Sequence, residues 1–371
     1  MKKLVIVQPY VPAYRLPFFT MLIERLMQEN ISCNVVAGVP DAAQAVRGDA
    51  VSASWLIHAK QNRVTFAGKT LTFGGTRKHW KDADAVIVGH LGSSLDTYLA
   101  LFGGRQRKVG VWGHIKSYVS EPHPIDSWLE RWQLRKADQV FAYTPGGTAY
   151  AIEAGVPAER VTTVFNAVDS SALINAQNAL TATETDTFIE THRLEPNWTV
   201  CFIGGLDASK RIAFLAEVLD KLWTIEPRVK LLVAGKGSDW ALLDAAADRN
   251  QVIRLGYADD RLRALTASVS RGIVMPGRIG LVAVDALILD RPIFTTDWPF
   301  HAPESEYLVE GESRITLTDD PSSFATELLQ HLANTQNVSV SPSGASPERP
   351  FPTLEQMVDN YAQGVVSLLA R

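Results

Sequence analysis

Long apolar runs are missing from this 371-residue chain, and none approaches the length of a membrane-spanning helix. Cysteine is also scarce: Cys33 and Cys201 lie far apart, without metal-binding or redox spacing, and we interpret them as packed free thiols in a reducing compartment. The segment MKKLVIVQPYVPAYR at residues 1–15 has two lysines but only a short apolar stretch. It predicts a buried strand and not a secretory signal, so we expect a cytoplasmic protein.

A strongly basic composition is likewise absent. Residues 1–185 hold 19 Lys+Arg and 15 Asp+Glu, a net charge of +4, whereas the remainder holds 17 and 25, a net charge of −8. The acidic second half argues against nucleic acid as a partner. The mildly basic first half suits an anionic acceptor or an anionic membrane surface, although ordinary scatter of surface charge explains it equally well.

Metal and dinucleotide signatures are missing too. Asp82 and Asp84 precede a predicted strand instead of ending one, and no His, Cys or Asp cluster has ligand spacing, so we expect a metal-independent protein without a cofactor. Gly235-Lys236-Gly237 follows a predicted strand but lacks the third glycine of a dinucleotide fingerprint, which disfavours a nicotinamide or flavin site.

Short β-branched runs and helical patterns alternate along the chain, and the series occurs twice. Strands are predicted in the first half at residues 4–7, 33–37, 85–88, 109–112, 139–143 and 161–165, and in the second at 200–203, 230–234, 252–255, 273–275 and 292–295. The helical patterns between them include residues 18–29, 127–136, 212–223, 239–249, 260–268 and 280–289, while residues 40–80 stay unassigned and 334–352 read as a loop. Such alternation indicates parallel sheets with crossover helices on both faces.

The chain is longer than one hydrophobic core usually supports. We therefore expect an α/β protein of two doubly wound, Rossmann-like domains that face each other across a cleft. Residues 1–180 would form the N-terminal domain and residues 181–350 the C-terminal domain. Residues 351–371 would form a C-terminal helix that packs back on the N-terminal domain.

The most informative segment lies at residues 274–293. A predicted strand ends, a Pro276-Gly277 turn follows, and Gly280 opens a helix. The first amides of a helix have no partner inside it and favour negative charge, so a diphosphate is the natural occupant of this position. Asp285, more than one turn into the helix, can present a carboxylate to a ribose diol.

This segment resembles the signature of the retaining family-four glycosyltransferases (glycosyl transferases group 1), which have the GT-B fold. In that family a Pro-Ser turn precedes Glu-Gly-Phe-Gly-Leu, and a second glutamate ends the motif. Aligned on Gly280-Leu281, the second glutamate falls on Asp285 and the first on Gly277, while Arg278 replaces the next glycine. The chain thus resembles a variant subgroup without the first glutamate, which in the family touches the donor sugar. The resemblance implies donor contacts from Gly277, Arg278, Ile279, Gly280, Leu281 and Asp285.

Two further segments carry the same resemblance. Residues 202–210 are similar to the family's Gly-Arg-Leu-x-x-x-Lys loop, which implies a donor site at Gly204, Gly205 and Lys210, with Lys210 on a donor phosphate. Gly205 stands where arginine is usual, and either Arg278 or Arg211 would substitute for it. Gly256 and Tyr257 match the strand end whose backbone binds the base.

The N-terminal half resembles the acceptor side of the same enzymes. Residues 137–169 match the last N-terminal strands and an Asn-Gly-Val-Asp signature, which places Asn166 and Asp169 at the hinge. Tyr10, Tyr14 and Arg15 replace a glycine-rich first loop and are candidates for binding the acceptor, although packing explains the prolines around them. His114 ends a strand where relatives place a histidine facing the donor sugar.

Together these matches imply a glycosyltransferase that moves a sugar, with retention, from a nucleotide diphosphate donor to a polysaccharide, lipopolysaccharide or lipid-linked glycan. UDP is expected ahead of GDP, and His114 and Asp285 are the candidate catalytic residues. His114 would donate a hydrogen bond, because the departing phosphate can take the acceptor's proton; in an inverting enzyme it would be the base. The alternatives are a non-catalytic partner subunit of the same fold and a sugar-nucleotide epimerase.

The predicted helix at residues 127–136 adds one further expectation. Trp128 and Trp132 lie one turn apart beside Arg131, Arg135 and Lys136. Such an aromatic and basic helix can rest on a membrane surface near a lipid-linked acceptor, although packing of both tryptophans in the core is an equal alternative.

Overall fold

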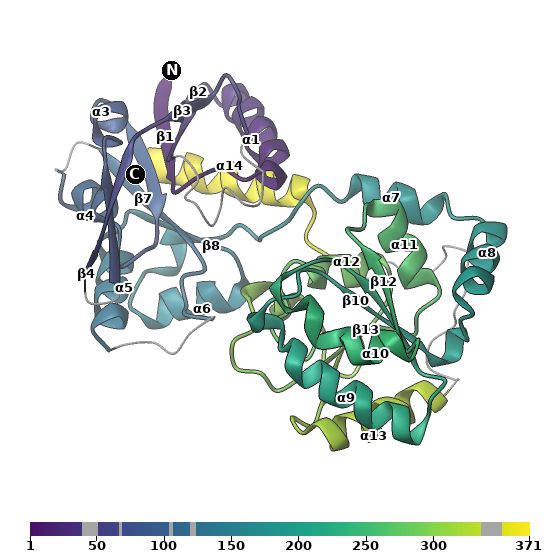
Figure 1. Ribbon diagram of the computed structural model, residues 1–371. Coiled ribbons are helices and arrows are strands. Elements are labelled where there is room, and N and C mark those ends of the chain that lie inside the picture. Colours follow the sequence, from purple (N-terminus) through teal and green to yellow (C-terminus); the bar gives the residue numbers. More distant parts are fainter. Residues whose placement is uncertain (39–50, 67–68, 104–106, 119–123, 335–350) are drawn as a thin grey trace. The chain divides into compact units, whose positions relative to one another are not determined.

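The structure is a computed structural model that describes residues 1–38, 51–66, 69–103, 107–118, 124–334 and 351–371. The chain forms two compact units, one of Met1–Asp169 with Pro352–Arg371 and one of Ser170–Phe351 (Figure 1). The boundary between the two units falls between Asp169 and Ser170, whereas the sequence analysis expects it at residue 180. Within the described ranges, no helix has the length and apolar character needed to cross a bilayer.

The first unit is built on a seven-stranded sheet of order β3-β2-β1-β6-β7-β8-β9, in which every neighbouring pair is parallel. Its strands are β1 (Lys2–Gln8), β2 (Ile31–Ala37), β3 (Leu56–His58), β6 (Ala85–Gly89), β7 (Lys108–Gly113), β8 (Gln139–Ala142) and β9 (Val161–Thr163). The strand order reverses at β1, which lies between β2 and β6. Open α/β sheets bind ligands beyond the carboxyl ends of the strands at such a point.

Helices cover both faces of this sheet, because alternate residues of each strand point to opposite sides. Leu4 and Ile6 of β1 pack with α1 (Leu16–Gln28) and α14 (Leu354–Ala370). Val5 and Val7 lie on the other face, in the core that also includes residues of α3 (Arg77–Trp80), α4 (Leu95–Phe102), α5 (Pro124–Lys136) and α6 (Pro145–Glu153). Continuously apolar strands such as Leu4–Val7 are therefore buried on two sides, which confirms the predicted parallel sheet.

Helix α14 is the last element of the chain and belongs to the first unit. A capping box of Thr353 and Gln356 begins it, and its apolar side packs on α1 and on β7–β9. Gly364 allows a close approach, since a Cβ there would lie 2.6 Å from the ring of Phe141.

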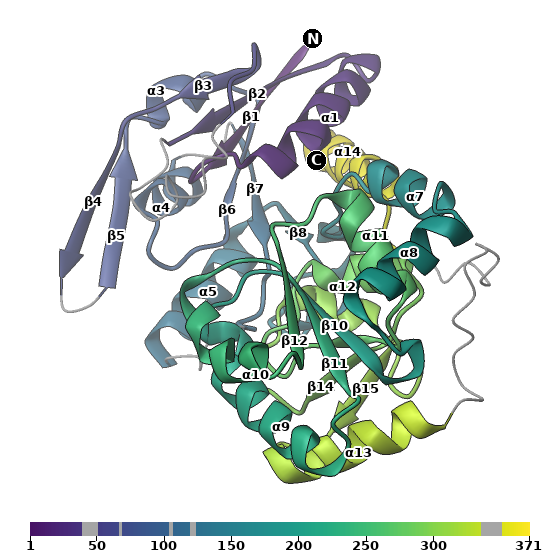
Figure 2. The ribbon, with the colours of Figure 1, turned by 45° about the vertical axis from the view of Figure 1, so that its right-hand side comes forward.

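An antiparallel hairpin of β4 (Gln61–Phe66) and β5 (Lys69–Gly74) forms a separate two-stranded sheet in the first unit (Figure 2). It lies in the stretch of residues 40–80 that the sequence left unassigned. The predicted loop at 334–352 falls mostly outside the described residues.

The second unit contains a six-stranded sheet of order β12-β11-β10-β13-β14-β15, again with parallel neighbours. The strands are β10 (Thr199–Ile203), β11 (Lys230–Ala234), β12 (Val252–Gly256), β13 (Ile273–Val274), β14 (Ile293–Thr296) and β15 (Arg314–Leu317). Its α-helices are α7 (Ser171–Asn178), α8 (Ala182–His192), α9 (Ile212–Ile225), α10 (Asp244–Asp248), α11 (Asp260–Ser268), α12 (Val282–Ile288) and α13 (Pro321–Ala333). The predicted helix at 239–249 is instead a 3-10 turn over Ser238–Leu243 followed by the short α10.

Candidate functional site

The turn after β13 lies directly against the loop after β10. A Cβ at Gly277 would be 2.5 Å from the carbonyl oxygen of Ser209 and 2.5 Å from the carbonyl carbon of Lys210. The amide of Arg278 donates to the Ser209 oxygen at 2.8 Å. Glycine at 277, where the family motif has glutamate, is therefore required by the close backbone contact between the two loops.

Lys210 is directed toward this turn. Its ammonium group donates to the carbonyl oxygen of Arg278. Burial lowers the pKa of Lys210. The negative charges of Asp207 and Glu304 oppose this shift, and the positive charge of the nearby Arg278 guanidinium adds to it. Two cations thus lie close together at the turn, and an anionic ligand bound there would relieve their repulsion.

His301 fixes the same turn from the other side. Its Nδ1 accepts a hydrogen bond from the Ile279 amide at 3.1 Å, and its Nε2–H donates to the Thr296 carbonyl at 3.3 Å. A neutral imidazole makes both bonds, and burial lowers the pKa of His301, which favours this neutral form. The sequence did not single out His301 as a site residue, because its role depends on a contact between separate segments.

The turn before α12 is open at Gly280, and the helix begins at Val282 and not at Gly280 as predicted. No atom lies within 4 Å of a Cβ built at Gly280. The first bonds of the helical turn run from the Ala283 amide to the Gly280 oxygen and from the Val284 amide to the Leu281 oxygen, both at 2.9 Å. The amides of Gly280 and Leu281 donate no hydrogen bond within that turn.

Asp285 is held in place by an arginine that the sequence did not indicate. Nη1 of Arg263 lies 2.6 Å from Oδ2 of Asp285, and the same guanidinium bonds Asp260. Burial raises the pKa of Asp285, while the positive charge of Arg263 opposes the shift. The carboxylate consequently has a fixed orientation on the first turn of α12.

The two arginines considered as substitutes for the missing loop arginine differ in their surroundings. Arg211 pairs with Asp319 at 2.7 Å, donates to the Thr296 hydroxyl at 2.9 Å and stacks over the rings of Phe214 and Trp298. These contacts connect Arg211 to the protein interior. Arg278 donates through Nε to the Phe300 carbonyl at 3.2 Å and is the cation close to Lys210.

Glycines of the predicted donor site and of the neighbouring loop after β11 have two different roles. Gly204 and Gly256 have φ values of +141° and +76°, in the region that favours glycine. Gly235 and Gly237 are packing residues, because their added Cβ atoms would lie 1.8 Å from the Gly204 oxygen and 2.0 Å from the Leu206 oxygen. The loop of Gly204 and Gly205 is thus clamped against the loop after β11. Tyr257, after β12, is 83% exposed.

His114 lies in the first unit, just after β7. Its ring centroid is 5.4 Å from that of Tyr143 and 6.3 Å from that of Tyr118. The close packing of Gly147 on the His114 carbonyl fixes the backbone, since a Cβ there would lie 2.8 Å from that oxygen. The three aromatic rings gather at the carboxyl ends of β7 and β8.

Tyr10, Tyr14 and Arg15 follow β1, but their environments differ. Arg15 is buried, donates to Asn166 and Tyr143 and lies among aromatic rings. Tyr14 is 46% exposed, and its ring lies under the Arg15 guanidinium. Arg15 thereby connects the loop after β1 to Asn166 near the end of the first unit's main segment.

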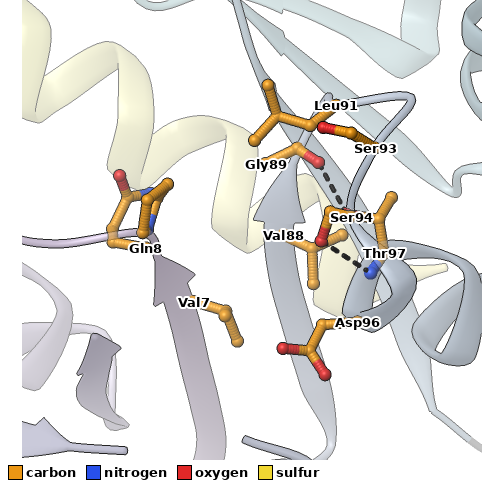
Figure 3. A pocket seen from close by; sticks show the side chains of 10 residues that line it. Val7, Gln8, Val88, Gly89, Leu91, Ser93, Ser94, Asp96 and Thr97 are labelled. Atoms are coloured by element: carbon orange, nitrogen blue, oxygen red, sulfur yellow. Dashed lines mark hydrogen bonds between the residues drawn. The ribbon is translucent and has the colours of Figure 1, made fainter. Parts of the chain in front are cut away.

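A small pocket of about 120 Å³, open to solvent, lies beyond the carboxyl ends of β1 and β6 (Figure 3). Val7, Gln8, Val88 and Leu91 contribute to its lining, together with Ser93, Ser94, Asp96 and Thr97 at the start of α4. Ser94 and Thr97 are engaged locally, by the helix cap and by a 2.8 Å bond to the Gly89 carbonyl. The buried Asp96 carboxylate is directed toward the gap between the two strands in Figure 3. Sequence reasoning did not indicate this pocket, which forms where the strand order reverses.

The described residues contain no group of three or more His, Cys, Asp or Glu side chains arranged to hold a metal ion. Asp84 accepts a hydrogen bond from the Lys3 amide at 2.7 Å, which lowers its pKa, and it pairs with Lys2. This residue has a structural partner at the start of β1.

Comparisons with known proteins place these features in a family context. Residues 197–334 match the family model described as glycosyl transferases group 1. No curated protein sequence matches the chain.

Solved structures similar to the chain include Anabaena Alr3699/HepE in complex with UDP, with 14% identity, a TM-score of 0.66 and coverage of 99% of this chain and 100% of that one. The same protein has also been solved with UDP-glucose. The lipopolysaccharide outer core galactosyltransferase WaaB aligns with 13% identity, a TM-score of 0.60 and coverage of 98% and 99%. A variant of S. aureus TarM, in complex with fondaparinux, alpha-GlcNAc-glycerol and UDP, has 12% identity, a TM-score of 0.57 and full coverage of both chains. At these identities the likeness establishes the fold.

Proposed function

We propose that this chain, whose residues 197–334 match the family model of glycosyl transferases group 1, is a nucleotide-sugar-dependent glycosyltransferase with the GT-B fold. It would transfer a sugar from a UDP-linked donor to an acceptor hydroxyl group with retention of configuration. One observation carries the proposal. The Lys210 ammonium donates to the carbonyl oxygen of Arg278, two residues before Gly280, where an added Cβ would meet no atom within 4 Å. A diphosphate bound at this turn would meet the cations of Lys210 and Arg278 and the amides of Gly280 and Leu281, which precede α12.

The donor phosphates would be held by Lys210 and by the amides of Gly280 and Leu281. Gly277 and Ile279 would shape the turn, the first through its contact with the loop at Ser209 and the second through His301. Arg278 would supply the charge that the arginine replaced by Gly205 supplies in relatives.

The nucleoside would extend from the phosphates toward Asp285 and the end of β12. The Asp285 carboxylate, fixed by Arg263, would accept hydrogen bonds from the ribose hydroxyls. The backbone at Gly256 and Tyr257 would contact the base, and Gly204 would border the donor. The UDP and UDP-glucose complexes of HepE support the choice of uridine over guanosine.

Chemistry would rest on positioning and charge stabilisation. As the bond between the sugar and the diphosphate breaks, Lys210 and Arg278 would stabilise the negative charge that develops on the phosphate. The departing phosphate would take the proton of the attacking hydroxyl, which keeps both partners on one face of the sugar. His114 would then serve as a hydrogen-bond donor to the sugar.

The acceptor would be bound by the first unit, with Tyr10, Tyr14 and Arg15 as the candidates taken from the sequence. The pocket between β1 and β6 adds Asp96 and Gln8, whose oxygens can accept hydrogen bonds from sugar hydroxyls while Val7 and Leu91 contact apolar faces. We favour a glycan acceptor, either polysaccharide, lipopolysaccharide or lipid-linked, and a cytoplasmic reaction at the inner face of the membrane. The two buried free thiols support a reducing compartment.

The test is a thermal-unfolding panel of UDP, GDP, UDP-glucose, UDP-galactose and UDP-N-acetylglucosamine. A donor present at 100 times its Kd stabilises the folded state by about 2.7 kcal/mol, so the true donor should raise the midpoint the most. The variant Lys210→Met should lose that shift. An equal response of wild type and Lys210→Met to every nucleotide would refute the proposed site.

The absence of the first glutamate keeps a second function open, that of a non-catalytic partner subunit. The tight backbone contact at Gly277 favours neither an active transferase nor a non-catalytic subunit, because packing alone explains the glycine at this position. Donor binding without transfer to any acceptor would support the partner subunit. Conversion of the sugar when the donor is supplied alone would instead indicate an epimerase.

A further inference from the structure

Large apolar side chains are exposed along one stripe of α4, on the side away from the sheet. Leu95, Leu99 and Phe102 follow each other at helical spacing and are 40%, 44% and 70% exposed. On the same helix, Thr97 and Ala100 point into the protein and are buried. A helix in a soluble protein normally presents polar residues to water, so this reversed pattern marks a surface that contacts something else.

Helix α5 continues the stripe. Ile125 and Trp128 are each 62% exposed. Trp132 joins the two helices, because its ring centroid lies 4.9 Å from that of Phe102 and 6.0 Å from that of Tyr98. Trp128 precedes Trp132 by one turn, which brings it next to this seam. We call the five exposed side chains the α4–α5 patch: Leu95, Leu99, Phe102, Ile125 and Trp128.

The charges next to the patch are unequal in exposure. Arg131, Arg135 and Lys136 are exposed, and the first two follow Trp128 at helical spacing along α5. The acidic residues of α5, Asp126 and Glu130, are only partly exposed. The Glu130 side chain lies against the loop before α4, about 3.9 Å from a Cβ built at Gly92. Arg131 also donates to the Tyr150 hydroxyl at 3.1 Å and interacts with the exposed Glu153 of α6, so Arg135 and Lys136 supply the excess of positive charge beside the patch.

We propose that the α4–α5 patch binds the surface of an anionic phospholipid bilayer. The apolar side chains would enter the boundary between headgroups and acyl chains, with Trp128 at the headgroup level, and the three cations would contact acidic headgroups. The basic rim favours this occupant over a second copy of the chain, because two such patches brought face to face would oppose like charges. The inference is independent of the donor site, which lies in the other unit.

The experiment is flotation of the full chain with vesicles of phosphatidylcholine alone and of phosphatidylcholine with 30% phosphatidylglycerol. We expect binding to the anionic vesicles that weakens as salt rises. The triple variant Arg131→Gln, Arg135→Gln, Lys136→Gln should lower the partition coefficient about 100-fold at low salt, since each cation near an anionic surface contributes a factor of about five. The triple variant Leu99→Ser, Phe102→Ser, Trp128→Ser should bind at least tenfold more weakly at any salt concentration.

A matched control changes exposed apolar residues elsewhere. Trp223 and Ile225 of α9 are 37% and 57% exposed, and the double variant Trp223→Ser, Ile225→Ser should bind vesicles like wild type. Circular dichroism and UDP binding of each variant show whether it is folded. Vesicle binding that is unaffected by both triple variants would overturn the proposal. So would a wild-type chain that ignores anionic vesicles but forms dimers that the apolar variant dissociates.

Discussion

Two glycines on the same turn should respond to alanine in opposite ways. At Gly277 a methyl group would lie 2.5 Å from backbone atoms of Ser209 and Lys210, which cannot rotate away as a side chain can. Overpacking of this kind costs about 1–3 kcal/mol or more. For a unit of this size that lowers the unfolding midpoint by about 2–4 °C per kcal/mol. The added methyl group would also push away the loop that carries Lys210, so Gly277→Ala should weaken UDP binding as well.

At Gly280 the same methyl group meets no atom within 4 Å, and the backbone is not in the left-handed region. Gly280→Ala should therefore leave the free energy of unfolding unchanged or raise it by up to about 1 kcal/mol, because alanine lowers the conformational entropy of the unfolded chain. If the diphosphate occupies that space, however, the methyl group displaces a charge-assisted hydrogen bond of about 1.5–3 kcal/mol, which weakens UDP binding roughly 10- to 100-fold.

Thermal unfolding and isothermal titration calorimetry with UDP distinguish the two variants. The expected pair of results is a less stable Gly277→Ala and a fully stable Gly280→Ala that binds UDP poorly. Wild-type UDP affinity in Gly280→Ala would show that the donor lies elsewhere, even if the protein proves to be a glycosyltransferase. Wild-type stability in Gly277→Ala would show that the two loops are not in the contact described.

Three further predictions concern the proposed donor site and a buried histidine of the first unit. Arg278→Ala should weaken UDP binding at least tenfold in calorimetry. Arg211→Ala loses the ion pair to Asp319, so it should lower the unfolding midpoint but change UDP affinity by less than twofold. The reverse ranking of the two UDP affinities would assign the phosphate contact to Arg211. Asp285→Asn should bind UDP about tenfold more weakly but inorganic pyrophosphate as well as wild type does, and equal losses for both ligands would exclude a ribose contact. Burial lowers the pKa of His90 from 6.5 to about 4, so the unfolded chain binds a proton on this histidine at a higher pH than the folded chain does. The free energy of unfolding should therefore fall by about 3 kcal/mol as the pH drops from 6.5 to 4. A His90→Gln variant whose urea unfolding keeps the same pH dependence would contradict this origin.

Much of the fold could be predicted from the sequence, because buried parallel strands are written as short apolar runs. The runs at residues 33–37 and 85–88 lie within β2 and β6. The stretch 40–80 could not be assigned, since the hairpin in it depends on pairing between two strands. Likewise the pattern at 239–249 resembles one helix, but the first half adopts a tighter 3-10 turn.

The candidate site was less accessible to sequence reasoning. Local motifs and the family resemblance led to the prediction of Lys210, Gly280 and Asp285 as site residues. They could not identify Arg263 or His301, whose partners lie on other segments of the chain. They also could not anticipate that the guanidinium of Arg15 is buried among aromatic rings, because that environment combines residues distant in sequence.

The first unit is discontinuous: residues of α14 complete a core whose other members lie before Asp169. During translation, the second unit has its whole chain available while one face of the earlier sheet still lacks this cover. That face includes Trp112 and Phe141, both of which contact Tyr361 of α14. Nascent chains that stall before residue 354 would thus present an aromatic surface to chaperones, and truncations there should be recovered mainly as aggregates.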